Sequence, residues 1–240
     1  MHRFYAPRDS FIADELVTLG QNETRHLRDV LRMRPGSVIH VFDGEGHEFR
    51  CELTEITRKH AIARVMNESD PASSESPLTL TLACAILKGE KFDLVVQKCV
   101  ELGVSRLIPL LTARCDVRLG DRSNKLDRWR KIALEATKQC GRAKLMEIGE
   151  PVSLSDIASG PIDGAAILFS ERDGSRLTDA MVTGRVTVFV GPEGGWDDAE
   201  LTAAREGNIA VVTLGGRILR AETAAIAISA LLQNRFGDLN

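Results

Sequence analysis

The chain has 240 residues, of which 43% are hydrophobic and 27% are charged, and its formal net charge at pH 7 is −3. These values predict a globular protein of one large or two modest domains, and they exclude a histone-like chain that captures nucleic acid through overall positive charge. No apolar stretch reaches the roughly 20 residues that span a bilayer, and the N-terminus lacks the apolar core of a signal peptide, so we expect a cytoplasmic protein.

The N-terminal part, residues 1–70, consists of short strand-like segments. Residues 37–66 alternate between apolar and polar side chains around a glycine turn at 43–46. This pattern predicts the hairpins of a small β-barrel. The stretch that follows, residues 71–77, is rich in Ser, Pro and acid and is typical of a surface linker.

An arginine-rich segment, "RHLRDVLRMR", covers residues 25–34. If it is helical, Arg25, Arg28 and Arg32 share one face. On spacing alone, a solvated helix face is the simpler interpretation. The use of Arg instead of Lys favours contact with RNA phosphates, because the planar guanidinium matches their geometry.

Histidine and cysteine give no metal motif. The five histidines show no recognisable ligand spacing, and the five cysteines are widely separated and include no CxxC pair. We therefore expect reduced thiols and no metal site.

From residue 78 onward, strand and helix patterns alternate. Strands are expected at 78–87, 106–111, 165–170, 186–191 and 210–214, and helices at 91–103, about 123–140, after 196 and from 221 onward. Gly103 stands where a helix C-cap belongs. This order predicts an α/β domain with a mainly parallel sheet, whose ligands bind beyond the carboxyl ends of the strands.

Three of those strand ends carry unusual sequences: "ILFSERDG", "VFVGPEGGW" and "VVTLGGRILRAET". Neither the GxGxxG fingerprint nor the GxxxxGK[ST] phosphate loop is present. A single glycine turn is weak support for a ligand site, because tight turns need glycine for steric reasons alone. Two glycine turns at successive strand ends, each joined to charged residues, favour a pocket whose backbone holds an adenine and a ribose.

These motifs resemble those of a known family. "GPEGGW" with Glu200, and then "LGGRILRAETAA", are similar to motifs of the SPOUT methyltransferases and most closely of the RsmE family, which methylates N3 of a uridine in small-subunit ribosomal RNA. The likeness includes "RHLRDVLRMRPG", "LKGEKFDLVVQKCVELGV" and "EATKQCGR", and it covers nearly the whole chain. It departs at "AKLMEI" after Arg142, where a proline-containing stretch is expected, and at Gly216 within the third motif.

The resemblance implies a PUA-like RNA-binding β-barrel at residues 1–70, a linker at 71–77, and a SPOUT α/β domain with a trefoil knot at 78–240. Its partners would be 16S ribosomal RNA in the small ribosomal subunit and a second copy of the chain. The final helix, 221–232, is the plausible dimer face. No membrane or metal partner is expected.

The resemblance also assigns a site for S-adenosylmethionine. The expected cofactor-binding residues are Phe169, Ser170, Gly191, Pro192, Glu193, Gly194, Leu214, Gly215, Gly216, Ile218, Leu219, Thr223 and Ala224. Arg220 is the candidate for stabilising the uracil anion, and Glu193 or Glu222 is the candidate acceptor for the N3 proton. Glu222 is also well placed to act only as a helix cap. Orientation of the two substrates can supply more of the rate than either side chain.

RNA recognition is assigned to basic residues in both domains. The residues expected to contact RNA are Arg3, Arg8, Arg25, Arg28, Arg32 and Arg34 in the first domain, and Lys88, Lys91, Arg114 and Arg142 in the second. Two other functions stay open. One is a SPOUT ribose 2′-O-methyltransferase, and the other is a non-catalytic ribosome-assembly factor that binds RNA without S-adenosylmethionine.

Overall fold

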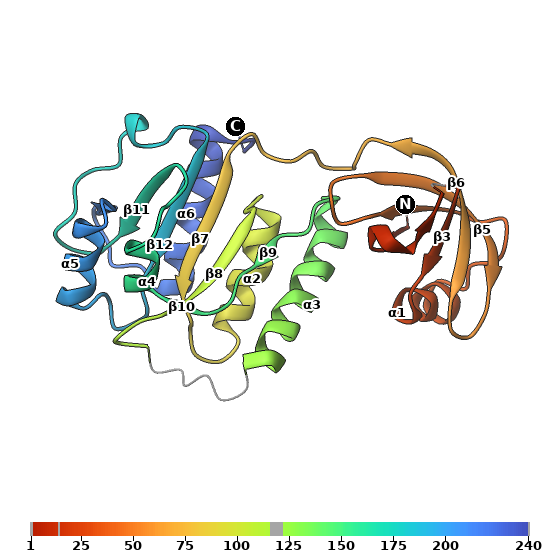
Figure 1. The fold of residues 1–240 in the computed structure, drawn as a ribbon, viewed down its shortest axis with the longest axis horizontal. Helices are drawn as coiled ribbons and strands as arrows, with labels where there is room; N and C mark the ends of the chain where they lie inside the picture. The colour runs from red at the N-terminus through yellow and green to blue at the C-terminus, as the bar shows by residue number, and fades with distance from the viewer. Residues whose placement is uncertain (1, 14, 116–121, 240) are drawn as a thin grey trace. The chain divides into compact units, whose positions relative to one another are not determined.

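The computed structural model describes residues 2–13, 15–115 and 122–239, and the chain forms two compact units (Figure 1). The first unit contains residues 1–75 and 137–145, and the second contains residues 76–136 and 146–240. Residues 137–145 thus pack with the first unit, whereas the predicted boundaries gave them to the second domain. Their return to the first unit has no signature in local sequence patterns.

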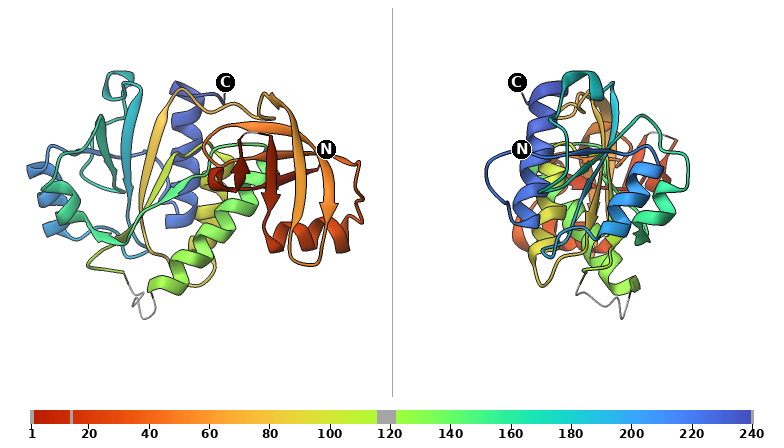
Figure 2. Two further views of the ribbon diagram at one scale, coloured as in Figure 1. Left: turned by 45° about the vertical axis from the view of Figure 1, so that its right-hand side comes forward. Right: turned by 90° about the vertical axis from the view of Figure 1, so that its left-hand side faces the viewer.

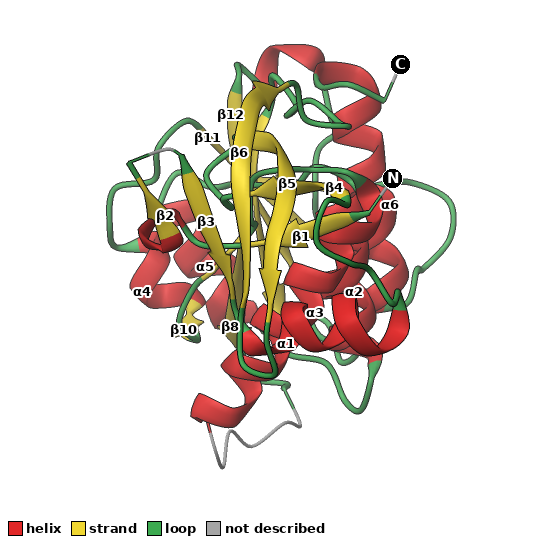
Figure 3. Ribbon diagram, turned by 90° about the vertical axis from the view of Figure 1, so that its right-hand side faces the viewer, coloured by secondary structure: helices red, strands yellow, loops and turns green. Residues whose placement is uncertain are grey.

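The first unit is built on a six-stranded sheet (Figure 3). Its strands are β1 (Arg3–Tyr5), β2 (Phe11–Ile12), β3 (Leu16–Leu19), β4 (Val38–Phe42), β5 (Glu48–Ile56) and β6 (Ala61–Ser69). They lie in the order β1-β4-β5-β6-β3-β2, with β1 parallel to β4 and the other pairs antiparallel. Alternate residues such as Phe4, Ile39 and Leu53 are buried in one apolar cluster, as a half-buried sheet requires.

The predicted hairpin at residues 43–46 is confirmed by the antiparallel pairing of β4 with β5. The buried Asp43 carboxylate organises its turn. Oδ1 accepts hydrogen bonds from the backbone N–H groups of Glu45, Gly46 and His47, and Oδ2 lies 2.8 Å from His47 Nδ1. An aspartate in this position replaces the backbone partners that the turn lacks.

The arginine-rich segment is not one regular helix. Helix α1 (Gln21–Arg25) continues into a π-helical turn, η2 (His26–Val30), and ends there. Arg32 has a φ of +52°, which is outside any right-handed helix. The expectation that Arg25, Arg28 and Arg32 share a helical face is therefore wrong, because the wider turn and the left-handed residue change the direction of the last side chain.

The second unit is an α/β fold around a seven-stranded, fully parallel sheet. Its strands are β7 (Thr79–Ala85), β8 (Arg106–Leu111), β9 (Glu147–Ile148), β10 (Val152–Ser153), β11 (Ala165–Phe169), β12 (Arg185–Val190) and β13 (Ala210–Val212). Six of them follow the order β10-β8-β7-β12-β11-β13, and β9 pairs with β8. The predicted α/β class with a mainly parallel sheet is confirmed.

Helices cover both faces of this sheet (Figure 2). The α-helices are α2 (Lys91–Glu101), α3 (Arg122–Cys140), α4 (Leu154–Ala158), α5 (Asp198–Glu206) and α6 (Ala221–Phe236), with a short 3-10 turn η3 (Asp179–Met181). Helices α2 and α6 pack against each other, and α4 and α5 do the same on the opposite face. Two-sided cover explains why strands such as β12 are almost continuously apolar.

Most elements of the second unit occur where the sequence pattern predicts them. Helix α2 buries Phe92, Val95 and Cys99 at the expected helical spacing, and Gly103 after it has a φ of +70°. The pattern did not predict β9, β10 and α4, because two-residue strands and a five-residue helix are too short to show a period. In the described part of the chain, no helix is both long and apolar enough to cross a membrane.

Candidate functional site

A cavity of about 460 Å³ lies at the carboxyl ends of β11, β12 and β13. This is the edge of a parallel sheet where ligands bind. Its described lining consists of apolar residues, glycines and four charged side chains. The lining residues are Phe169, Ser170, Glu171, Val190, Gly191, Pro192, Glu193, Gly194, Gly195, Trp196, Leu214, Arg217, Ile218, Leu219, Arg220, Ala221, Ala224 and Ile228.

One wall of the cavity is the loop of residues 191–195, here called the packed loop. A Cβ on Gly191 would lie 3.0 Å from the ring of Trp196, which is tighter than ordinary side-chain contacts. The buried Trp196 indole Nε1 donates a 2.8 Å hydrogen bond to the carbonyl oxygen of Phe169 at the end of β11. Gly195 has a φ of +70°. Glycine is therefore required here by close packing and by backbone conformation.

Helix α5 fixes the far end of the packed loop. Asp197 is its N-cap and accepts from the Ala199 N–H, while the Glu200 carboxylate accepts from the Asp197 N–H, which completes a capping box. The other oxygen of Glu200 accepts a 2.9 Å hydrogen bond from the N–H of Ala113, in the loop after β8. The cap thus ties two strand-end loops together.

Another part of the lining comes from residues 213–220, here called the open loop, of which Leu214 and residues 217–220 reach the cavity. Gly216 has a φ of +99°, and a Cβ on Gly215 or Gly216 would meet no heavy atom within 4 Å. Residues 215–220 are all exposed, and Ile218 retains 85% of its accessible surface. Arg220 is the N-cap of α6, and its side chain makes no capping hydrogen bond.

The chain before the open loop is held from two directions. β13 pairs with β11, and Ser170 N–H donates to the Val212 carbonyl at 2.9 Å. Thr213 N–H donates to the Ser175 carbonyl at 2.9 Å, so the loop after β11 also contacts the end of β13. A Cβ on Gly174 would come within 2.5 Å of the Thr213 backbone nitrogen. The two segments are therefore in direct backbone contact.

Most of the expected cofactor residues surround this cavity. Gly215, Gly216 and Thr223 do not contribute to its described lining, and the other ten expected residues do. The lining also includes seven residues that were not expected there: Glu171, Val190, Gly195, Trp196, Arg217, Ala221 and Ile228. Glu171 and Arg217 belong to the charged strand ends that were singled out, so the same signal would have included them. Ile228 is brought in only by the packing of α6.

The three residues proposed for catalysis are not equivalent. Arg220 and Glu193 line the cavity, whereas Glu222 is outside its described lining. Lys91 connects the two acids, because its Nζ lies 2.9 Å from Glu193 Oε1 and 3.8 Å from Glu222 Oε2. Lys91 was expected to contact RNA, and in the structure it pairs with these two carboxylates.

Electrostatics keeps Glu193 ionised. Burial acts to raise the pKa of its carboxyl, but the hydrogen bond from Lys91 and those from the backbone of Glu193 and Lys88 act in the opposite direction. The net result is a pKa below the ordinary value. A carboxylate in this state holds a negative charge at neutral pH and is a weak proton acceptor.

Lys88 and Arg114, the other two residues of the second unit that were expected to contact RNA, lie near the packed loop. Lys88 is exposed at the end of β7. Arg114 donates a 3.1 Å hydrogen bond from Nη1 to the Gly194 carbonyl and lies 3.6 Å from an Asp197 carboxylate oxygen. Arg114 therefore supports the packed loop from the β8 side.

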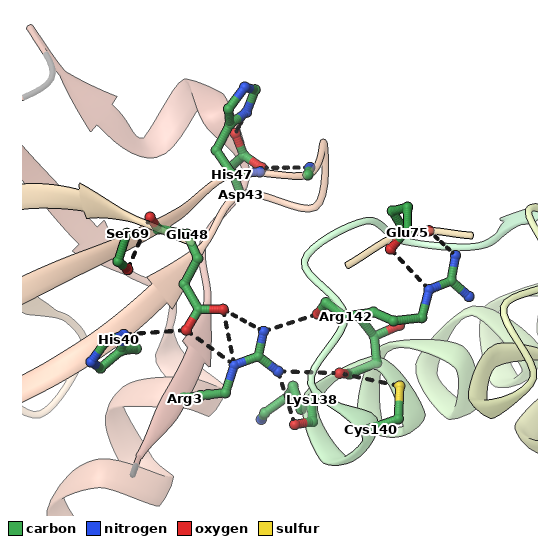
Figure 4. Close-up of polar contacts among 12 residues, drawn as sticks. Arg3, His40, Asp43, His47, Glu48, Ser69, Glu75, Lys138, Cys140 and Arg142 are labelled. Carbon is green, nitrogen blue, oxygen red and sulfur yellow. Dashed lines mark hydrogen bonds and ion pairs between the residues drawn. The ribbon is translucent and has the colours of Figure 1, made fainter. Parts of the chain in front are cut away.

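Arg3 and Arg142, both expected to bind RNA, are instead used inside the first unit (Figure 4). Arg3 forms an ion pair of 2.7 Å with the buried Glu48 and donates to the carbonyl oxygens of Lys138 and Arg142 at the end of α3. Arg142 is buried and pairs with Glu75 at 2.6 Å. Because protein acceptors occupy these guanidinium groups, both residues are weaker candidates for contact with an RNA phosphate.

The other expected RNA contacts are more accessible. Arg8, Arg25, Arg32 and Arg34 are exposed. The Arg8 guanidinium lies over the rings of Phe11 and Phe49 at 5.3 and 5.5 Å. Arg28 is half-buried and forms a two-point pair with Asp29, at 2.6 and 2.8 Å. Its planar group is thus satisfied locally, which makes it a weaker candidate for a phosphate.

No group of three or more potential metal ligands occurs in the parts of the chain that the structure describes. The five cysteines are free thiols. Burial raises the pKa of Cys51 to about 12 and that of Cys84 well above its ordinary value. These two thiols are therefore protonated and unreactive at neutral pH.

Comparison with known proteins gives two family matches. Residues 74–233 match the model of an RNA methyltransferase domain, and residues 19–66 match the model of an RNA methyltransferase PUA domain. Among named proteins, the chain is 35% identical to ribosomal RNA small subunit methyltransferase E of Synechocystis, over 93% of this chain and 76% of that protein. It is 31% identical to the Bacillus subtilis protein of the same name, over 87% of this chain and 86% of that protein.

Solved structures give similar matches. The ribosomal RNA small subunit methyltransferase E of Neisseria gonorrhoeae, bound to S-adenosylmethionine, has a TM-score of 0.90 with 36% identity and complete coverage of both chains. A putative methyltransferase of Legionella pneumophila, also in complex with S-adenosylmethionine, has a TM-score of 0.87 with 31% identity, over 99% of this chain and 98% of that one. Both likenesses extend over the two units.

Proposed function

The chain belongs to the RNA methyltransferase family that includes ribosomal RNA small subunit methyltransferase E, and on this basis we propose that it methylates N3 of a uridine in 16S ribosomal RNA. It is an S-adenosylmethionine-dependent ribosomal RNA methyltransferase. The observation that carries the proposal is the cavity lined by two glycine-containing strand-end loops. Its lining combines apolar residues with four charged side chains. We infer that the substrate is an assembled or nearly assembled small subunit.

The residues of the cavity fit an adenosyl ligand. Its volume lies within the range of small-molecule sites, which is roughly 300–1,000 Å³. Phe169, Val190 and Ile228 provide apolar surface for a base. Gly215 follows the lining residue Leu214, and a Cβ on it would meet no heavy atom within 4 Å, so we infer that a ligand can approach the backbone there. When bound there, S-adenosylmethionine supplies an electrophilic methyl carbon on its sulfonium.

Arg220 is proposed to stabilise the uracil anion. Uracil N3 carries a proton and is a poor nucleophile until that proton leaves, so negative charge develops on the ring during the reaction. Arg220 lines the cavity, is exposed and makes no helix-capping hydrogen bond. Its planar donors are suited to a delocalised anion that arrives in this position.

Either Glu193 or Glu222 is the candidate acceptor of the N3 proton. Glu193 reaches the cavity, but its lowered pKa makes it a weak base. Glu222 is on the far side of Lys91 and outside the described lining. We therefore propose that neither carboxylate dominates the rate, and that orientation of the uracil together with Arg220 supplies most of the acceleration.

We propose that the second unit is knotted and that it functions as a homodimer in the cytoplasm. In support of the knot, the loop after β11 contacts the end of β13 from a second direction, and the chain then continues into α6, which packs on β7 and β12 in the middle of the sheet. In support of the dimer, the exposed Ile218 and Leu219 lie beside the cavity, where a partner would cover them.

Recognition of RNA is proposed to rest on the first unit. Arg8, Arg25, Arg32 and Arg34 are exposed there, and phosphate contacts by such residues make affinity strongly dependent on salt. Because N3 lies on the pairing edge of uracil, the target base must be unpaired or turned out of its helix before it can enter the cavity.

The test is methyl transfer to small subunits from cells that lack the modification. After nuclease digestion, mass spectrometry of the nucleosides distinguishes a methyl group on the uracil from one on the ribose. We expect 3-methyluridine at one position, with subunits better substrates than naked RNA. A 2′-O-methyl product would replace the proposal by the ribose reaction, and failure to bind S-adenosylmethionine would favour a non-catalytic assembly factor.

A further inference from the structure

The charged residues of the cavity are divided between its two walls. The carboxylates Glu171 and Glu193 belong to the loops after β11 and β12, whereas Arg217 and Arg220 belong to the open loop. A cavity with acid on one wall and arginine on the other is suited to a ligand that carries both signs of charge.

The two carboxylates are held to different degrees. Glu193 is held by Lys91 at 2.9 Å, with 36% of its side chain exposed. Glu171 is exposed, and a Cβ on Gly195 would lie 2.8 Å from its Oε1, so its carboxylate lies against the packed loop.

Lys91 does not cancel the charge of this wall. It stands between Glu193 and Glu222, and Glu222 Oε2 is buried without a hydrogen-bond donor in the described structure. Lys91 is therefore shared between two carboxylates and does not neutralise both. On the Glu171 side, Arg172 lies 4.0 Å away but pairs more closely with Asp198, at 2.8 Å.

On the basis of the proposed function, we propose that Glu171 and Glu193 select the cationic cofactor by charge. The sulfonium of S-adenosylmethionine is positive, whereas the thioether of the product, S-adenosylhomocysteine, is neutral. Both molecules share the adenine, ribose and amino-acid groups. The negative charges of Glu171 and Glu193 therefore raise the affinity for the cationic methyl donor relative to that for the neutral product. The product must leave before the next turnover.

This assignment gives Glu193 a role that agrees with its ionisation. A carboxylate with a lowered pKa is a poor proton acceptor but a permanent negative charge. The charged and titratable groups around it come from four parts of the fold: Lys88 and Lys91 before and at the start of α2, Arg114 after β8, Cys84 on β7, and Arg220 and Glu222 at the start of α6.

The experiment compares three ligands on four proteins by titration calorimetry. The ligands are S-adenosylmethionine, S-adenosylhomocysteine and the non-reactive analogue in which an aminated carbon replaces the sulfonium. The proteins are the wild type, Glu171→Gln, Glu193→Gln and the control Glu206→Gln, which removes an exposed carboxylate at the end of α5. Glutamine keeps the size of the side chain and removes its charge.

We expect each cavity variant to lower the affinity ratio of S-adenosylmethionine to S-adenosylhomocysteine by about two- to fivefold, the scale of a partly exposed charge pair. The affinity for the aminated analogue should fall in the same variants and by a similar factor as the affinity for S-adenosylmethionine. The control variant should keep the wild-type affinity ratio. In wild type the ratio should also fall as salt rises, because screening weakens a charge effect. The salt series needs no variant, so it holds even if a substitution prevents folding.

Three results would overturn the inference. Equal weakening of both natural ligands would mean that the carboxylates bind a group the ligands share, such as the ribose. A ratio unchanged within error in both variants would remove charge selection altogether. A wild-type ratio independent of salt would do the same. Failure of the proposed function is distinct, because wild type would then bind none of the three ligands.

Discussion

The packed loop and the open loop have similar glycine content but opposite environments. Residues 191–195 are confined by Trp196, Arg114 and Glu171, and a side chain on any of the three glycines would meet another group within 3.1 Å. In the open loop, Gly215 and Gly216 have free space around them, and Arg217 to Arg220 are exposed. Glycine thus permits close packing in one loop and leaves open space beside the backbone in the other.

This difference separates two kinds of contribution to the site. The packed loop contacts the folded core through the buried Trp196, so changes at Gly191 should first affect the free energy of unfolding. The open loop contributes little packing, so changes in it should affect binding and rate while the fold persists. Substitutions in the two loops can therefore test the comparison directly.

The largest effect is expected at Arg220. Arg220→Lys retains the positive charge but loses the planar donors, so the single-turnover rate of methyl transfer should fall about 10²- to 10³-fold, with normal affinity for S-adenosylmethionine. The melting temperature should not change, because Arg220 is exposed and makes no capping bond. Arg205→Lys, an exposed arginine in the last turn of α5, is the control.

Saturating RNA is essential in that assay. If Arg220→Lys reacts at the normal rate once RNA is bound, and only the RNA affinity falls, Arg220 is a phosphate contact and does not stabilise the uracil anion.

The next effect is a contrast between two glycines. Gly191→Val must displace the Trp196 ring, and overpacking of this kind typically costs about 1–3 kcal/mol. We expect a fall in melting temperature of about 2–4 °C for each kcal/mol. The free energy of unfolding of Gly215→Val should lie within about 0.5 kcal/mol of the wild-type value. The variant should nevertheless lose S-adenosylmethionine binding, because the valine side chain would occupy space that the ligand needs.

Thermal unfolding and calorimetry measure both variants. Equal destabilisation by the two substitutions would contradict the distinction between the loops. Unchanged cofactor affinity in folded Gly215→Val would remove the open loop from the binding site.

The sequence predicted the second unit well, because its elements are long enough to show a period. Phe92, Val95 and Cys99 mark the buried face of α2, and glycines follow each strand that borders the cavity. Local patterns could not predict that α6 brings Ile228 to the cavity, or that Lys91 faces two carboxylates. Those relations depend on tertiary packing, and Lys91 and Glu193 are 102 residues apart in the sequence.

The first unit shows the same limit more clearly. Arg3 and Arg142 are of the residue type expected on an RNA-binding surface. In the structure, however, their side chains are buried and pair with Glu48 and Glu75. An isolated arginine in a sequence does not reveal whether its partner is a phosphate or a carboxylate. For Arg142, the pairing with Glu75 depends on the return of residues 137–145 to the first unit.

A smaller effect on stability is expected at Ile218. The side chain retains 85% of its accessible surface, so Ile218→Ser should change the free energy of unfolding of one chain by less than about 0.5 kcal/mol. If a partner covers this residue, light scattering should give about twice the 26.3 kDa chain mass for wild type and a lower mass for the variant. Met66→Ser, at an exposed apolar residue of the first unit, is the control. A monomeric wild type with full activity would refute the proposed dimer.

The smallest change is expected in the pH dependence of Glu193→Gln. Because the pKa of Glu193 lies below its ordinary value, its carboxylate is ionised throughout the neutral range and cannot generate a slope there. If the uracil loses its proton before methyl transfer, the single-turnover rate should instead rise about tenfold per pH unit, both in wild type and in Glu193→Gln. Saturating S-adenosylmethionine removes the effect of weaker cofactor binding.

A general base that is already ionised gives a flat pH profile of the single-turnover rate. A flat profile for wild type and a rising profile for Glu193→Gln would therefore identify Glu193 as the proton acceptor. The same measurement on Glu222→Gln tests the second carboxylate, and parallel slopes in all three proteins would leave Arg220 and substrate orientation as the sources of catalysis.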